Sequence, residues 1–84
     1  MLKLMRLGEI HKLQVGSDAW KNAVYRYAMI TLNNKQENEL QTNGTLNMTI
    51  NIGQCSDFRS YICNVKLYID GTNDTSQITY EEYN

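Results

Sequence analysis

The chain has 84 residues, and eight basic and nine acidic side chains give it a net charge of −1 at pH 7. This length suffices for a single domain, residues 1–84, with a thin hydrophobic core, and it excludes a separate catalytic or cofactor-binding domain. Apolar residues make up 42% of the chain, too many for an intrinsically disordered segment. The near-zero net charge excludes a polyanionic mimic of DNA and provides no overall attraction toward nucleic acid or lipid.

The amino-acid usage is unusual. The chain has no proline, ten asparagines, seven isoleucines and six tyrosines, but only three alanines. AT-rich coding sequences, such as those of low-GC bacteria and their phages, tend to produce this usage. We therefore expect the chain to come from such a genome.

No membrane-spanning or targeting segment is visible in the sequence. The longest uninterrupted apolar run, residues 28–30, is far shorter than the roughly 20 residues that cross a membrane. Residues 1–7 alternate apolar with basic side chains and lack the continuous apolar core of a signal peptide. We therefore expect no membrane association and a cytoplasmic location, in the host cell if a phage encodes the protein.

Residues 2–15 carry apolar side chains in an alternating pattern that Gly8 interrupts. The pattern predicts a strand with a bulge or bend at Gly8, or two short strands that meet there. A helix is the alternative, and Gly8 would cost it about 1 kcal/mol. The apolar residues of this segment are Leu2, Leu4, Leu7, Ile10, Leu13 and Val15.

The next segment has the periodicity of an amphipathic helix. Ser17 or Asp18 can cap its start by accepting a backbone N–H bond. Apolar residues then recur at helical spacing, and they define a face of Ala19, Trp20, Ala23, Val24, Tyr27 and Ala28. Tyr25 falls on the opposite, polar face. The pattern predicts one α-helix over about 18–32. A strand over 25–32 is the competing interpretation, but it would mix apolar and polar residues on both of its faces.

Residues 33–43 are polar, with Leu40 as the single apolar side chain, and they end in Asn43-Gly44. We expect a frayed helix end here, followed by a loop.

The C-terminal half has the period-two alternation of half-buried strands. In residues 45–52 one face carries Leu46, Met48, Ile50 and Ile52, and the other carries Thr45, Asn47, Thr49 and Asn51. After a turn over 53–60, residues 61–69 repeat the pattern with an apolar face of Tyr61, Cys63, Val65, Leu67 and Ile69. Asp70-Gly71 is a turn signal, and residues 77–80 form the last short strand.

These elements predict an α+β fold. One α-helix packs on a small antiparallel β-sheet, and the C-terminal half forms a three-stranded meander whose apolar face is covered by the segment around Trp20. A compact all-β barrel is the alternative, and it requires residues 20–32 to form a strand.

The two cysteines, Cys55 and Cys63, flank the predicted turn. Zinc sites need four ligands, usually with shorter spacing, and the only other soft ligand is His11, so we expect no metal and no cofactor. A disulfide would close the hairpin if the two side chains faced each other. Because no secretory signal is visible, we favour two free thiols.

His11 is the only histidine, and on a strand it would share a face with Glu9, as in a general-base pair. No motif ties a nucleophile to this pair, and the sequence has no glycine-rich phosphate loop or nucleophile elbow. We therefore predict that the protein is not an enzyme and has no catalytic residues.

Charge is distributed unevenly along the chain. Residues 1–35 contain six basic and two acidic side chains, whereas residues 36–84 contain two basic and seven acidic ones. The predicted basic surface consists of Lys3, Arg6, Lys12, Lys21 and Arg26. Together with Trp20, Tyr25 and Tyr27 it would suit nucleic acid, but the helix prediction buries Trp20 and Tyr27. Charge complementarity toward a protein partner, or between copies of the chain, fits at least as well.

Two segments are candidate partner-binding sites. The outward row of Thr45, Asn47, Thr49 and Asn51 is neutral and poorly defended against edge pairing. The C-terminal Tyr80, Glu81, Glu82 and Tyr83 combine carboxylates with tyrosine, a residue enriched at interfaces.

The first functional hypothesis is therefore a small non-enzymatic protein-binding module, an accessory or inhibitor protein of a phage or mobile element that acts on a host or defence protein. One alternative is a self-assembling virion or other structural component, since a thin core and a neutral strand favour burial between copies in a homo-oligomer. Another alternative is a nucleic-acid-binding protein that uses the basic N-terminal half.

Overall fold

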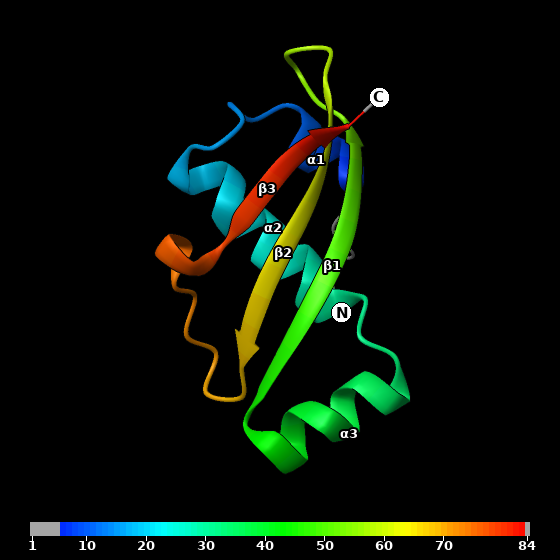
Figure 1. Ribbon diagram of the computed structural model, residues 1–84, viewed down its shortest axis with the longest axis vertical. Coiled ribbons are helices and arrows are strands. Elements are labelled where there is room, and N and C mark those ends of the chain that lie inside the picture. Colours follow the sequence, from blue (N-terminus) through cyan, green and yellow to red (C-terminus); the bar gives the residue numbers. More distant parts are fainter. Residues whose placement is uncertain (1–5, 84) are drawn as a thin grey trace.

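The computed structural model, which describes residues 6–83, contains three helices and one three-stranded antiparallel sheet (Figure 1). The helices are α1 (Leu7–His11), α2 (Asp18–Ile30) and α3 (Asn34–Asn43). The strands are β1 (Thr45–Gln54), β2 (Ser60–Tyr68) and β3 (Thr79–Tyr83), and a short 3-10 turn, η1 (Thr75–Gln77), precedes β3. The strand order β1-β2-β3 confirms the α+β fold with a C-terminal meander, and the sheet is open rather than closed into a barrel.

The elements form two layers. In Figure 1, α2 crosses behind the sheet, α1 lies behind one end of β1, and α3 lies beyond the other end of β1. One sheet face therefore packs against helices. Within residues 6–83, no helix covers the opposite face, which we call the outer face.

The alternation of β1 and β2 produces the buried side of the sheet. Leu46 pairs with Leu67, and Ile50 pairs with Cys63, so apolar side chains from both strands point toward the helices. Ile69 is an exception to the predicted pattern: β2 ends at Tyr68, the chain turns, and Ile69 is 48% exposed. The predicted inward orientation of Ile69 is wrong because β2 stops one residue before it.

Helix α2 begins where the sequence indicated. Ser17 Oγ accepts a hydrogen bond from the Trp20 backbone N–H at 3.1 Å, and Trp20 is fully buried.

Tyr25, expected on the polar face, is also fully buried. Its hydroxyl donates to the backbone carbonyl of Asp74 at 2.6 Å, so the connection before β3 supplies the partner that this polar group needs.

Three aromatic rings join α2 to the sheet. Trp20 packs edge-to-face on Tyr80 at a centroid distance of 5.0 Å and on Tyr61 at 6.2 Å. Tyr61 and Tyr80 contact each other at 5.9 Å, also edge-to-face. We call Trp20, Tyr61 and Tyr80 the aromatic cluster. Such pairs add about 0.5–1.5 kcal/mol each beyond the burial of their area.

The strand predicted in residues 2–15 is wrong over the part that the structure describes. Residues 7–11 form α1, in which the Glu9 carboxylate accepts the backbone N–H of Arg6 at 3.0 Å. Ile10 is fully buried and anchors this short helix on the core. Leu2 and Leu4 lie outside the described residues.

The polar segment after α2 forms a complete helix, α3, rather than a frayed end and a loop. Asn33 Oδ1 accepts the Gln36 backbone N–H at 2.8 Å, and Gln36 Oε1 accepts the Asn33 backbone N–H at 3.0 Å. Gly44 ends the helix in the left-handed conformation at φ 79°, and Leu40 is the buried anchor. This reciprocal cap compensates for the few apolar residues of the segment.

The last strand lies slightly later in the chain than predicted. Gln77 belongs to η1, in which the Asp74 carboxylate accepts the backbone N–H of Ser76 at 3.1 Å, and β3 starts at Thr79. None of the helices in residues 6–83 is long and apolar enough to cross a membrane.

The burial of Trp20 gives a direct test of this packing. We expect Trp20→Ala to lower the free energy of unfolding by about 3–5 kcal/mol, because it removes the ring that contacts both tyrosines. Met29→Ala on the same helix, where the side chain is 40% exposed, should cost under about 1 kcal/mol. Chemical denaturation of both variants checks the difference, and equal losses would contradict the assigned core.

Candidate functional site

The outer face of the sheet gathers residues from all three strands. The predicted neutral row of β1 lies there and pairs with alternate residues of β2. The β2 residues of this face between Ser60 and Asn64 pair in turn with alternate residues of β3. From β1 to β3, the outer face consists of Thr45, Asn47, Thr49, Asn51, Ser60, Ile62, Asn64, Lys66, Tyr68, Thr79, Glu81 and Tyr83.

Side-chain hydrogen bonds cross the strands on this face. Thr49 Oγ1 donates to Asn64 Oδ1 at 2.8 Å, and the Tyr83 hydroxyl donates to Asn51 Oδ1 at 2.5 Å. The second bond joins β3 to β1, so the tyrosine side chain reaches across β2. These bonds hold the polar groups in fixed positions.

Asn51 also shapes the end of β1. Its Oδ1 accepts the Gly53 backbone N–H at 3.0 Å, at the point where a bulge shifts the pairing between β1 and β2. Gly53 adopts φ 80°, a conformation that glycine tolerates best. Ile52, the residue of the bulge that has no pairing partner in β2, accepts a hydrogen bond at its carbonyl from His11 Nε2–H.

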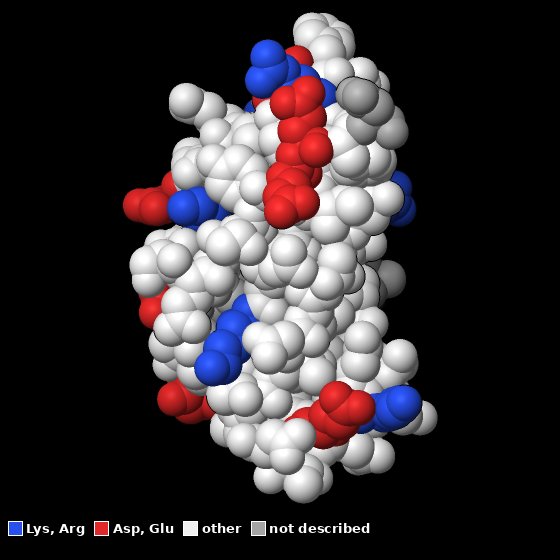
Figure 2. Space-filling view, in the orientation of Figure 1, with Lys and Arg blue, Asp and Glu red and all other residues white. Residues whose placement is uncertain are grey.

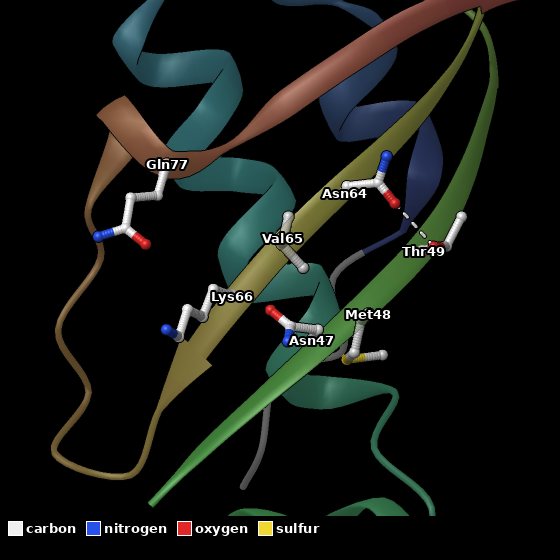
Figure 3. A pocket seen from close by; sticks show the side chains of 7 residues that line it. All are labelled: Asn47, Met48, Thr49, Asn64, Val65, Lys66 and Gln77. Atoms are coloured by element: carbon white, nitrogen blue, oxygen red, sulfur yellow. Dashed lines mark hydrogen bonds between the residues drawn. The ribbon is translucent and has the colours of Figure 1, made fainter.

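A shallow hollow of about 340 Å³ lies on the outer face (Figure 3). Amide and hydroxyl side chains from two strands and from η1 line it, and Lys66 is its only charged lining residue. The Lys66 Nζ atom lies 5.7 Å from the centre of the Tyr68 ring. The hollow therefore offers hydrogen-bond donors and acceptors with little charge; its polar lining residues are Asn47, Thr49, Asn64, Lys66 and Gln77.

The structure divides the C-terminal motif between the two sides of the sheet. Glu81 and Tyr83 lie on the outer face, whereas Tyr80 pairs with buried Cys63 and packs in the aromatic cluster. Glu82 shares the side of Tyr80 and lies 3.6 Å from Arg59. The motif therefore does not form one contiguous contact surface, because successive side chains of a strand alternate in direction. Figure 2 shows the outer face mostly uncharged, with acidic groups gathered toward the end of β3.

The β1–β2 hairpin tip, residues 55–59, presents a feature that we did not predict from the sequence. Phe58 is 84% exposed and has φ 66°, a conformation that is rare for a bulky residue. Its N–H donates to the Cys55 carbonyl at 2.9 Å, and the Cys55 N–H donates to the Arg59 carbonyl at 2.9 Å. The available sequence signal was a lone aromatic residue in a polar turn.

Asp57 fixes the geometry of the hairpin tip. Its carboxylate accepts the Tyr61 hydroxyl at 2.5 Å and the Arg59 backbone N–H at 3.1 Å. The bond from Tyr61, followed by the N–H of Arg59, lowers the pKa of Asp57 below its ordinary value. The same bond to the carboxylate raises the pKa of Tyr61. Both shifts show a carboxylate that is stabilised in its charged form.

A second hollow, of about 260 Å³, lies between α2 and the end of β2, with residues 71–73 on one side. We call it the apolar hollow. Its only charged lining residue is Arg26, from the predicted basic set, and its larger lining side chains are Tyr25, Arg26, Met29, Ile30, Leu67 and Tyr68.

The remaining predicted basic residues are spread over the helical layer. Arg6 and Lys12 are exposed at the two ends of α1, and Lys21 is half-buried on α2. Lys3 lies outside the described residues. Trp20 and Tyr25, which nucleic-acid bases would need as stacking partners, are both fully buried. The structure therefore does not combine these cations with the two rings on one surface.

His11 and Glu9 do not face each other as a general-base pair. The His11 ring is bonded to the Ile52 carbonyl, and the Glu9 carboxylate is bonded to the Arg6 backbone. Within residues 6–83, no group of three or more His, Cys, Asp or Glu side chains could hold a metal ion.

Cys55 and Cys63 are both buried and unpaired, so the structure contains no disulfide between them. Burial raises the pKa of the Cys55 thiol and raises that of Cys63 to about 12. Because the thiolate is the reactive form, burial protects both sulfurs.

We expect neither thiol to react with an aromatic disulfide reagent within minutes at pH 8 in the folded protein, and both to react at once in denaturant. The absorbance of the aromatic thiolate that the reagent releases measures the rate of this reaction. Rapid reaction of the folded protein would contradict the buried placement.

No protein-family model, curated protein sequence or solved structure matches this chain. The functional inference therefore rests on the geometry of the described residues.

The hydrogen bond between Asp57 and Tyr61 makes a pH-dependent prediction. Tyr61→Phe should raise the pKa of Asp57 toward its ordinary value of about 3.9, because the main donor to the carboxylate is lost. The bond stabilises the folded state while Asp57 is charged, so the variant should be less stable at neutral pH and match the parent protein once acid protonates this carboxyl. Carboxyl NMR titration checks the shift, with Asp70, held by Thr72, as the unchanged control.

Proposed function

We propose that this chain is a small non-enzymatic protein-binding module that contacts its partner through the outer face of the sheet. The observation that supports this proposal is a three-stranded face, uncovered within residues 6–83, on which two pairs of polar side chains are already bonded across the strands. Binding there requires little further ordering of side chains, and ordering is one of the main costs of association.

The chemistry of the outer face suits a protein surface. Neutral amides and hydroxyls are cheaper to remove from water than charged groups, and the cores of protein interfaces are depleted of charge. Tyr68 and Tyr83 add aromatic contact area of the kind that is enriched in interfaces. Ile62, half-buried between the neighbouring strands, adds an apolar centre.

We propose that this chain is an accessory or inhibitor protein of a phage or mobile element, and that its partner is a host or defence protein in the cytoplasm of the host cell. The asparagine-, isoleucine- and tyrosine-rich, proline-free usage supports an AT-rich genome of origin.

Affinity capture with matched variants tests the proposal. The immobilised parent protein should retain one protein in stoichiometric amount from a lysate of a low-GC bacterium. Thr49→Arg should reduce retention at least about tenfold, because it places an unpaired charge in the middle of a neutral interface. Thr42→Arg, the same change on exposed α3, should leave retention unchanged.

Both variants must unfold thermally within a few degrees of the parent protein, so that a loss of retention reflects the surface. The proposal fails if no stoichiometric protein is retained, or if Thr49→Arg and Thr42→Arg retain it equally.

A further inference from the structure

The most exposed large apolar side chain of residues 6–83 is Phe58, at 84%. A single exposed apolar side chain is ordinary on a protein surface, but Phe58 is presented from an ordered tip. The outer face does not use this ring, since the hairpin tip lies beyond the last residue pair of the β1–β2 ladder, Gln54 with Ser60.

Hydrogen bonds order the backbone of the hairpin tip beneath the ring. In addition to the two backbone bonds and the Asp57 contacts, Gln54 Nε2 donates to the Phe58 carbonyl at 3.2 Å, and Ser56 Oγ donates to the Leu13 carbonyl at 3.3 Å. Phe58 is thus kept in a left-handed conformation that it would otherwise avoid. The backbone that carries the ring therefore needs little further ordering when the ring binds.

The apolar hollow has the size and lining that such a ring needs. Its volume of about 260 Å³ exceeds that of an engineered cavity of about 150 Å³ that binds benzene. Met29 and Ile30, which line it, are 40% and 41% exposed, so binding a ring there would cover two unpartnered apolar side chains.

The hollow and the ring cannot meet within one chain. They lie at opposite ends of β2, since Ser60 follows the hairpin tip and Tyr68 lines the hollow. Nine residues of strand separate two such points by roughly 25 Å. In Figure 1 the tip is at the top of the molecule and the end of β2 is near the bottom. Only a second copy brings the two surfaces together.

The charges at the two surfaces are also complementary. Asp57 precedes Phe58 in the tip, and Arg26 is the only charged residue that lines the hollow. Within residues 6–83 the one ion pair joins Arg59 to Glu82, so Arg26 has no acidic partner among them. A ring seated in the hollow would bring Asp57 of one copy toward Arg26 of the next.

We propose that copies of this chain associate head to tail, with Phe58 of one copy seated in the apolar hollow of the next. The two contacting surfaces differ, so the contact is heterologous and generates a ring or an open chain of copies rather than a symmetric dimer. One aromatic anchor is less than a standard interface, and we expect a dissociation constant on the order of 0.1–1 mM.

Two variants that each remove one half of the contact test the proposal. Phe58→Asn removes the ring and keeps a residue that tolerates the left-handed conformation. Met29→Glu places a carboxylate in the hollow, where it opposes both the ring and Asp57. In NMR dilution series from about 2 mM to 0.05 mM, the parent protein should show concentration-dependent shifts at Phe58 and around Arg26 and Met29, whereas each variant alone should show none.

Mixing the two variants supplies the decisive measurement. Phe58→Asn retains a hollow and Met29→Glu retains a tip, so together they should form a 1:1 complex that stops at two copies. An absence of concentration-dependent shifts in the parent protein, self-association that survives Phe58→Asn, or a failure of the variants to complement each other would overturn the proposal.

The outcome of this self-association test can be distinguished from the outcome of the partner-retention test of the outer face. Thr49→Arg should reduce partner retention at least about tenfold and leave the dilution shifts intact, whereas Phe58→Asn should abolish the dilution shifts and leave partner retention intact.

Discussion

The packing of Trp20 between Tyr61 and Tyr80 is the contact on which the other features depend. It joins α2 to both β2 and β3. Without this contact, the apolar face of these two paired strands would be only partly covered. A chain of this length buries only a modest core, so one fully buried indole carries a large share of it. Because the aromatic cluster directs α2 to one side of the sheet, the other side remains available as the outer face.

The outer face and the hairpin tip are both stabilised by polar side chains that also serve the fold. Asn51 accepts bonds from Gly53 at the bulge and from Tyr83 on the last strand, so the same amide shapes β1 and orders the face. Asp57 likewise holds the turn and bonds Tyr61, a member of the aromatic cluster. Both surfaces are therefore continuous with the core, and substitutions there need stability controls.

Elements with a strong local pattern could be predicted from the sequence. The alternation of Leu46 to Ile52 specified β1, and the cap at Ser17 with the helical spacing after it specified α2. Helix α1 was given only as the alternative to a strand, and α3 was expected as a frayed end, because each has one fully or nearly fully buried apolar anchor, Ile10 or Leu40. Each otherwise depends on side-chain hydrogen bonds at its N-terminus. The Asn33–Gln36 pair was the signal that would have identified α3.

The sequence by itself determined which residues alternate, which segment covers the sheet and that one strand face is neutral, because these follow from periodicity within a single element. Only the tertiary structure decided that Tyr25 is buried, since its hydroxyl bonds a carbonyl 49 residues away. It also decided that Tyr80 packs on Trp20 while Tyr83 reaches Asn51, and that Phe58 extends from an ordered tip. Such outcomes depend on strand register and on contacts between distant segments, which no local pattern encodes.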